Sequence, residues 1–332
     1  MPKYAQDRSS ESRARPAIDR NILGLWLSMV VCGAICLPGL LPVPASAEDI
    51  RTTPQVIQVG PARAITTIAA AAKLARAGAL IEVDSGEYSG DVAVWTQDSL
   101  TLRAIGGRVK LRAAGAAAEA KAIWVVRANG MLVEGFDFEG AVVPDRNGAG
   151  IRLEKGSLRI RDCRFMYNEM GLLTSNDPST TLDVENSEFA FNQRPDDHNH
   201  NLYVGRIARL TVTGSYFHHA SIGHLLKSRA AINQIYYNRL TDEPGGSASY
   251  ELEFPDGGVA YVVGNLIEQG ARTGNPTLIS FGAEGYKWPR NEIYLVNNTL
   301  VNNLPRGGVF LRVAQGANTI RAINNQIGRA HV

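Results

Sequence analysis

The sequence predicts an all-β fold, namely a right-handed parallel β-helix with an N-terminal capping helix. One short pattern recurs, in which alternating apolar residues precede a Gly, Asp or Asn turn and a further apolar residue. The equivalent turn positions are Gly135, Asp162, Asn186, Gly214, Tyr237, Gly264, Asn297 and Asn324, at intervals of 23 to 33 residues. These intervals are too short for βαβ crossovers and contain no amphipathic helical segment, so three short strands and three turns fit each repeat. A β-sandwich is the alternative fold.

The first 47 residues have the order of a secretory signal peptide. Five basic residues precede an uncharged apolar run over 22–37, and Ala45-Ser46-Ala47 supplies a small-residue cleavage signal. Cleavage leaves 48–332 as a single β-helix domain, which we expect to be exported, periplasmic or secreted, and without membrane attachment. An uncleaved membrane anchor is the alternative reading of the same segment.

Cleavage also changes the cysteine content and the charge. Cys32 and Cys36 leave with the leader, so Cys163 remains alone and is expected to pack as a small buried hydrophobe. The chain has 34 basic residues (Lys and Arg) and 32 acidic residues (Asp and Glu). The leader contains five of the basic and three of the acidic residues, so 29 basic and 29 acidic residues remain after cleavage. A neutral domain gives no general attraction to nucleic acid, so an anionic partner requires a local patch.

After the leader, 65–77 is Ala-rich with helix-forming composition, and 78–90 is an apolar strand that runs into a Gly-rich turn. We expect a helix that covers the open end of the sheet, followed by the first strand. This opening resembles that of the pectate-lyase-like superfamily, in which a capping helix leads into a strand ending in a Gly-x-Tyr turn, here Gly86-Glu87-Tyr88. Asn at successive turns, as in Asn186, Asn265, Asn297 and Asn324, tolerates left-handed backbone and can bond to the amide of the next coil. The polar segment 192–199 is expected to loop out, and 268–291 to form a second wall.

Three side chains that could take part in catalysis are evenly spaced in the sequence. Tyr203, Lys227 and Glu251 lie 24 residues apart in short strand-like segments. Because neighbouring strands lie about 4.8 Å apart, this spacing predicts one column of a phenol, an ammonium and a carboxylate. Arg229 and Glu253 would lie one pleat along.

This column suits elimination on a 4-linked uronate. Arg229 could neutralise the substrate carboxylate, Lys227 could remove the C5 proton, and Tyr203 or His200 could protonate the bridging oxygen. Lys227-Ser228, followed by Asn233 and Asn238, resembles the chondroitinase-B and alginate-lyase family of parallel β-helix lyases. The resemblance implies a polysaccharide lyase or a related epimerase with Lys227 as general base. The family places an Arg on the strand one coil later, where this chain has Glu251, Glu253 and Asp256.

Those acids leave two other functions open. A carboxylate beside Lys227 would favour its ammonium form, a conflict that disappears if Glu251 and Glu253 bind a hard cation such as Ca²⁺, or if Glu253 is itself catalytic. Glycoside hydrolysis by a pair drawn from Glu251, Glu253 and Asp256 is one alternative. A non-catalytic polysaccharide-binding β-helix, in which the column only stabilises the surface, is the other.

Five of the six histidines lie between His198 and His224. His198 and His200 could ligate a metal together with Asp196 and Asp197, although their spacing matches no recognised zinc pattern. One alternative is that His200 and His224 hydrogen-bond inside turns, and another is that they line a sugar groove, here for an acidic polysaccharide. The expected substrate-binding residues are His198, His224, Asn201, Asp256, Glu284 and Tyr286.

Overall fold

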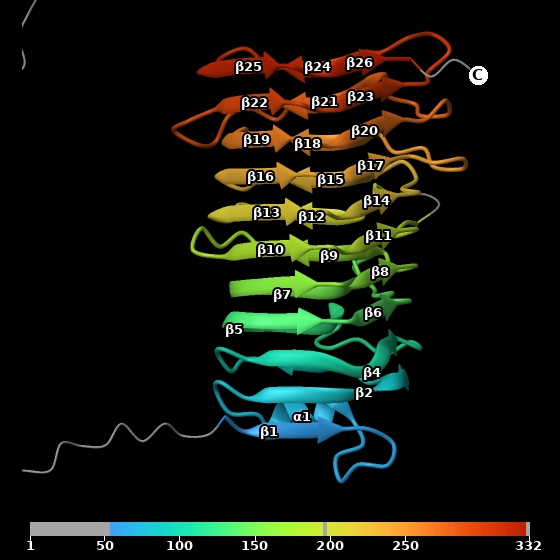
Figure 1. The fold of residues 1–332 in the computed structure, drawn as a ribbon, viewed down its shortest axis with the longest axis vertical. Coiled ribbons are helices and arrows are strands. Elements are labelled where there is room, and N and C mark those ends of the chain that lie inside the picture. The colour runs from blue at the N-terminus through green and yellow to red at the C-terminus, as the bar shows by residue number, and fades with distance from the viewer. Residues whose placement is uncertain (1–53, 195–197, 330–332) are drawn as a thin grey trace, which may run out of the picture. The chain divides into compact units, whose positions relative to one another are not determined.

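The computed structural model describes residues 54–194 and 198–329, and these build a parallel β-solenoid of about ten coils (Figure 1). The predicted fold class is therefore confirmed. The predicted signal peptide lies outside the described residues, as do Asp196 and Asp197. None of the helices in the described ranges is long and apolar enough to cross a membrane.

Each regular coil contributes one strand to each of three faces, and every strand pairs in parallel with its equivalents in the coils before and after it. The first face contains β3 (Ala93–Trp95), β5 (Ala122–Glu134), β7 (Ala149–Arg161), β9 (Met170–Thr174), β12 (Leu202–Val204), β15 (His224–Ser228), β18 (Tyr250–Phe254), β21 (Thr277–Phe281) and β24 (Val309–Val313). The second face contains β1 (Val56–Val59), β2 (Leu80–Ser89), β4 (Thr101–Arg112), the second halves of β5 and β7, β10 (Thr181–Glu185), β13 (Arg209–Thr213), β16 (Ile232–Tyr236), β19 (Val259–Val263), β22 (Glu292–Val296) and β25 (Thr319–Ile323). The third face contains the second halves of β2 and β4, β6 (Phe136–Glu139), β8 (Arg164–Met166), β11 (Glu188–Ala190), β14 (Tyr216–His218), β17 (Arg239–Thr241), β20 (Leu266–Gln269), β23 (Thr299–Asn302) and β26 (Gln326–Gly328).

The turn from the second face to the third is made by the residues that the repeat predicts. All eight of them have a positive φ, between 47° and 86°. Gly and Asn reach this left-handed region at little cost, which explains why they recur at these positions. The repeat alignment is therefore correct, including Tyr237, whose ring is largely exposed.

Side-chain ladders run along the interior from coil to coil. Phe138, Phe165, Phe189 and Phe217 stack with ring centroids 4.7 to 4.8 Å apart. Beside the turn, the side chain of Asn265 accepts from the backbone N–H of Asn238 at 2.8 Å and donates to Asn298 at 3.0 Å. An amide ladder is thus present, but its members are Asn238, Asn265, Asn298 and Asn325. Of the four asparagines predicted to bond from coil to coil, Asn265 belongs to this buried ladder, and Asn324 donates to Asn297 of the preceding coil at 2.7 Å in a separate exposed pair.

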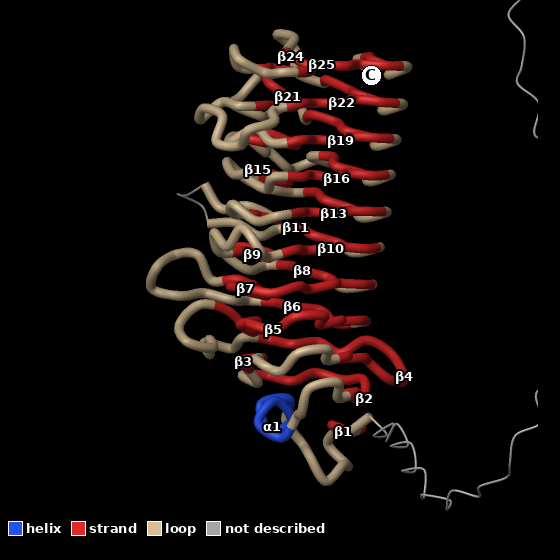
Figure 2. The backbone as a smooth tube through the Cα atoms, turned by 90° about the vertical axis from the view of Figure 1, so that its left-hand side faces the viewer, coloured by secondary structure: helices blue, strands red, loops and turns tan. Residues whose placement is uncertain are grey.

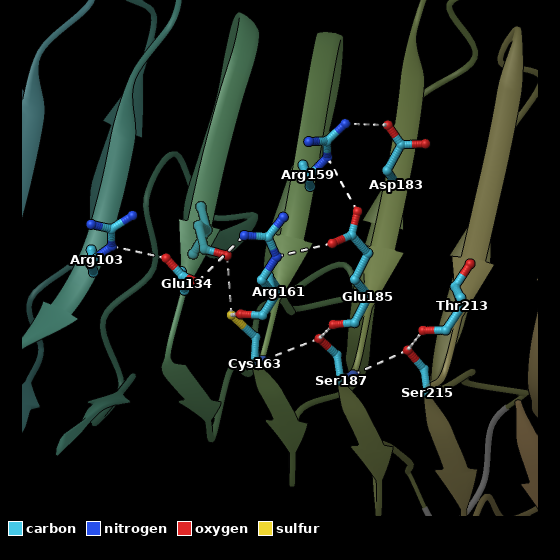
Figure 3. A network of polar contacts seen from close by, with 11 residues as sticks. Arg103, Glu134, Arg159, Arg161, Cys163, Asp183, Glu185, Ser187, Thr213 and Ser215 are labelled. Atoms are coloured by element: carbon cyan, nitrogen blue, oxygen red, sulfur yellow. Dashed lines mark hydrogen bonds and ion pairs between the residues drawn. The ribbon is translucent and has the colours of Figure 1, made fainter.

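Figure 3 shows a polar network that runs across successive strands of the second face and the turns that follow them. Outside, Arg103, Glu134, Arg161 and Glu185 are register partners on successive strands and alternate in charge. Inside, Cys163 is 1% exposed and its backbone N–H donates to the Ser187 hydroxyl. Burial raises the pKa of the Cys163 thiol to about 12, so this cysteine is the inert packing residue that the sequence predicts.

The N-terminal end differs from the expected order. The predicted helix is present as α1 (Ile68–Leu74), next to β1 and β3 (Figure 2). Its first turn is capped by Thr67, which accepts from Ala70, and by Asp91, which accepts from Ile68 at 2.6 Å. However, β1 precedes the helix and pairs with β2, so the expectation that the helix comes before the first strand is wrong.

Candidate functional site

The centre of the site is a column on the first face. Tyr203 on β12 pairs in register with Lys227 on β15, as the spacing predicts. Lys227 then pairs with Glu253 on β18 rather than with Glu251. The prediction of Glu251 is wrong because the coil from β15 to β18 advances 26 residues instead of 24.

Glu251 is completely buried and lies beside Asp242. Burial, together with the Asp242 carboxylate, raises the pKa of Glu251 well above its ordinary value. Asp242 accepts hydrogen bonds from the backbone N–H groups of Ala248 at 2.9 Å and Gly270 at 3.1 Å. The two acids therefore form a buried pair with Glu251 protonated, and Glu251 does not reach the site.

The Lys227 ammonium lies between two carboxylates. Its Nζ is 3.0 Å from Glu253 Oε2 and 3.1 Å from Glu284 Oε1. Glu253 is buried and also lies 3.1 Å from His224 Nδ1. Burial raises the pKa of Glu253, but the contacts with His224 and Lys227 outweigh it, and the net pKa is lowered. Glu253 is therefore a buried anion that fixes the Lys227 side chain.

The Arg229 guanidinium follows directly after β15 and uses all three nitrogens. Nε donates to Tyr203 Oη at 3.0 Å, Nη1 contacts Asp256 at 2.5 Å, and Nη2 contacts Glu284 at 2.7 Å. Asp256 is completely buried and also binds Arg206 Nε at 2.6 Å. Burial lowers the pKa of Arg229, but these partners outweigh it, and the net pKa is raised. Asp256 is thus a buried anchor that orients Arg229 toward Tyr203, and it does not meet a ligand itself.

Glu284 is the exposed member of this network. Its side chain is 47% exposed, whereas those of Glu253 and Asp256 are 4% and 0% exposed. It lies in the long turn between β21 and β22, which is anchored where the Trp288 indole N–H donates to the Arg229 carbonyl at 3.0 Å. The predicted second wall is therefore in contact with the column, and Lys227 and Arg229 hold its exposed carboxylate between them.

Two histidines lie beneath the column. His200 Nδ1 accepts from the backbone N–H of His224 at 2.9 Å, and the His200 ring stacks on Tyr203 at 5.4 Å. Burial lowers the pKa of both histidines, that of His200 well below its usual value. His200 is therefore neutral near pH 7, and because Nδ1 is the acceptor, its hydrogen is on Nε2.

Three of the expected substrate-binding residues have different surroundings. Asn201 is completely buried, accepts from Asn192 and donates to the His218 carbonyl, so it is removed from the site. The Tyr286 hydroxyl donates to the Ala314 carbonyl at 2.7 Å, which makes it an anchor of its own turn. His198 is exposed and close enough to lower the pKa of both His200 and His224.

Within residues 54–194 and 198–329, no group of three or more His, Cys, Asp or Glu side chains is arranged to hold a metal ion. The pair suggested for Ca²⁺ does not fit one, because Glu251 faces Asp242 while Glu253 faces Lys227 and His224.

Sequence reasoning missed Arg206 and Arg152. Arg206 binds the second oxygen of Asp256 and so helps to fix Arg229 from the preceding coil. Arg152 on β7 lines a cavity of about 350 Å³ that also includes Tyr203, Asn147 and Asn176. The sequence did contain a signal for Arg152. In the strand segment AGIRLE it is a charged residue between two apolar residues, at a position whose side chain alternation directs outward.

Comparisons with known proteins agree on the fold. No protein-family model matches the chain, and no curated protein matches it in sequence. Among solved structures, the pectate lyase Pel9A has a TM-score of 0.50 and 14% identity, over 84% of this chain and 79% of that one. An alginate lyase from Paenibacillus has a TM-score of 0.42 and 11% identity, over 82% and 99%. A pectin methylesterase from Aspergillus niger has a TM-score of 0.45 and 14% identity, over 82% and 85%. The similarity to the pectate lyase confirms the parallel β-helix fold that the resemblance in sequence implies.

Proposed function

We propose that this protein is an exported polysaccharide lyase that cleaves a uronate-containing polymer by β-elimination. One observation carries the proposal: Lys227 and Arg229 together bind a single exposed carboxylate, that of Glu284, beside the Tyr203 hydroxyl. The Glu284 carboxylate stands where the carboxylate of a substrate uronate would bind. The acidic polymer and the exported location are parts of this proposal.

A substrate carboxylate can take the place of Glu284 at small cost. Glu284 is half exposed on a surface turn, so its carboxylate can return to water, and the incoming carboxylate keeps both cations paired. Glu253 and Asp256, in contrast, are buried counterions that stay in place and keep the two cations oriented. The site is thus preorganised for one carboxylate, with a charged donor on each side of it.

Elimination begins with loss of the proton at C5 of the uronate. Its electron pair forms the C4–C5 double bond, the C4–O4 bond breaks, and the departing O4 takes a proton. Negative charge develops on the uronate carboxylate as the C5 proton leaves, and Lys227 and Arg229 stabilise this charge. Their side chains are only 11% and 13% exposed, which strengthens the electrostatic effect relative to water.

The contacts favour Tyr203 as the group that moves the proton. Arg229 Nε donates to Tyr203 Oη, which holds a cation beside the oxygen that would accept the C5 proton. The resulting phenol can return the proton to O4 when the C5–H and C4–O4 bonds lie on the same face of the sugar. An ammonium paired with two carboxylates is better suited to binding a carboxylate than to removing a proton, so we assign Lys227 to binding rather than to the base role.

Hydrolysis by a pair of acids has little support in the geometry. Glu251, Glu253 and Asp256 are all buried. Glu251 lies beside Asp242, whereas Glu253 and Asp256 are ion-paired with Lys227 and Arg229. A hydrolase needs one carboxyl as acid and another as base or nucleophile, both reaching the scissile bond. None of the three is placed to do so.

The test uses the full chain incubated with 4-linked polyuronates and, as a control, with neutral polysaccharides. We expect ultraviolet absorbance from an unsaturated sugar end, only with the acidic polymers. New reducing ends without that absorbance would contradict a lyase and indicate hydrolysis. Exchange of the C5 hydrogen with solvent without cleavage would indicate an epimerase, and binding without either product would indicate a binding protein.

A further inference from the structure

A second cation faces a cavity on the same surface as the proposed active site. Arg152 on β7 lines the cavity of about 350 Å³ together with Asn147, Asn176 and Tyr203. Met170 and Leu173 supply part of its apolar lining. Most of the lining is polar, with Thr174 and Ser175 beside the two asparagines and Arg152, which suits a hydroxyl-rich, anionic ligand such as an acidic sugar.

Arg152 belongs to the column that carries the proposed chemistry. It pairs in register with Leu173 on β9, which pairs with Tyr203, which in turn pairs with Lys227. Residues paired across parallel strands face the same side, so all four face outward. At about 4.8 Å per strand, Arg152 lies about 10 Å from Tyr203 and about 14 Å from Lys227 along the solenoid.

The guanidinium of Arg152 lacks the partners that the other site cations have. Within the described part of the chain it makes no hydrogen bond or ion pair, and its buried Nε has no acceptor. Burial lowers the pKa of Arg152 and so disfavours its charged form. Arg206 and Arg229, in contrast, each form an ion pair with the buried Asp256. Glu154 offsets part of the burial cost of Arg152 from a distance, but its carboxylate is ion-paired with Lys121 and Arg127, so an anion entering the cavity would stabilise the Arg152 charge further.

We propose that Arg152 binds the carboxylate of a second uronate in the same polymer chain, whose reacting uronate lies at Lys227 and Arg229. This inference rests on the proposed function and deepens it, because it gives the polymer a direction along the solenoid axis. Asn147 and Asn176 add amide groups suited to sugar hydroxyls. The cavity thus forms a remote subsite that contributes binding and takes no part in proton transfer.

The experiment is calorimetric titration of the full chain with a 4-linked uronate disaccharide and hexasaccharide, and with a neutral hexasaccharide. Arg152→Gln should weaken binding of the acidic hexasaccharide about tenfold or more, the range for a hydrogen-bonded charge. Binding of the disaccharide, which reaches only Lys227 and Arg229, should not change. Arg152→Lys should give an intermediate loss of hexasaccharide affinity, because lysine keeps the positive charge but lacks the two parallel N–H donors of a guanidinium.

Arg321→Gln is the matched control, since Arg321 is an exposed arginine on β25 of the second face. It should bind every ligand like the wild type. Arg152→Gln should unfold no earlier than the wild type, because the change removes an unpaired charge. Equal hexasaccharide affinity for wild type and Arg152→Gln would overturn the subsite while leaving the proposed function intact. A wild type that binds no uronate ligand would overturn both.

Discussion

Lys227 Nζ lies 3.1 Å from Glu284 Oε1, although 57 residues separate the two in sequence. The contact forms because the turn after β21 reaches back over two coils to β15, held by the hydrogen bond from Trp288 to the Arg229 carbonyl. The same turn therefore supplies both a wall of the site and a carboxylate that occupies it. A carboxylate supplied by the protein competes with one supplied by a substrate.

Glu284→Gln should strengthen substrate binding. The amide keeps the shape of the side chain but no longer ion-pairs with Lys227 and Arg229, so the substrate carboxylate meets less competition. We expect KM for a polyuronate to fall about two- to fivefold, the equivalent of an exposed ion pair, with little change in kcat. Glu292→Gln is the control and should leave KM unchanged. Glu292 is the first residue of β22, and its ion pair with Arg290 lies outside the site. A higher KM in Glu284→Gln would show that Glu284 assists binding.

Glu251→Gln should remove a pH dependence of stability. The folded-state pKa is raised for Glu251, and for Asp242 to about 6, so the folded protein holds protons that the unfolded chain releases. Stability from this pair is fully present below the ordinary pKa near 4 and is lost as pH rises through the folded-state values.

Urea unfolding at about pH 4 and pH 8 measures this effect. The variant and the wild type should be similar at the lower pH, and the variant should be more stable by about 1–3 kcal/mol at the higher pH. A variant that is less stable than the wild type at pH 8 would show that Glu251 is ionised in the folded protein.

Asn265→Ala should destabilise the solenoid. The Asn265 side chain donates to the Ile235 carbonyl and to Asn298, and accepts from Asn238, so its loss leaves buried groups unpaired in three coils. We expect a loss of about 2–4 kcal/mol in the free energy of unfolding. Asn297→Gly is the control, because its side chain is exposed and glycine suits its φ of 55°; it should change stability by less than about 0.5 kcal/mol. Equal losses in both variants would contradict the ladder.

The repeat could be predicted from the sequence because its signal is local. A left-handed turn selects Gly, Asn or Asp at one position, and the apolar residues beside it must face the core. The register between Lys227 and its acid could not be predicted in the same way. It depends on the length of the turn from the third face back to the first, which is irregular and is three residues longer before β18 than before β15.

Burial explains the other differences at the site. Alternation places Glu251 and Glu253 on the same side of β18, but Glu251 is covered and paired with Asp242, whereas Glu253 meets Lys227. Asn201 occurs in a polar segment, as a surface residue would, yet it lies in an interior amide ladder with Asn192. In both cases the contacts that bury the residue come from other coils. The residue pattern of its own strand therefore does not reveal them.

The most direct test of the proposed mechanism is the rate at which Tyr203→Phe forms unsaturated product from a polyuronate. The variant loses the hydroxyl that binds Arg229 Nε and keeps the ring that stacks on His200. We predict a fall in kcat of about 10²- to 10⁴-fold, the usual contribution of a positioned acid–base group, with oligouronate affinity changed by only a fewfold. Turnover equal to that of the wild type would contradict the assignment of Tyr203 as the proton-transfer group.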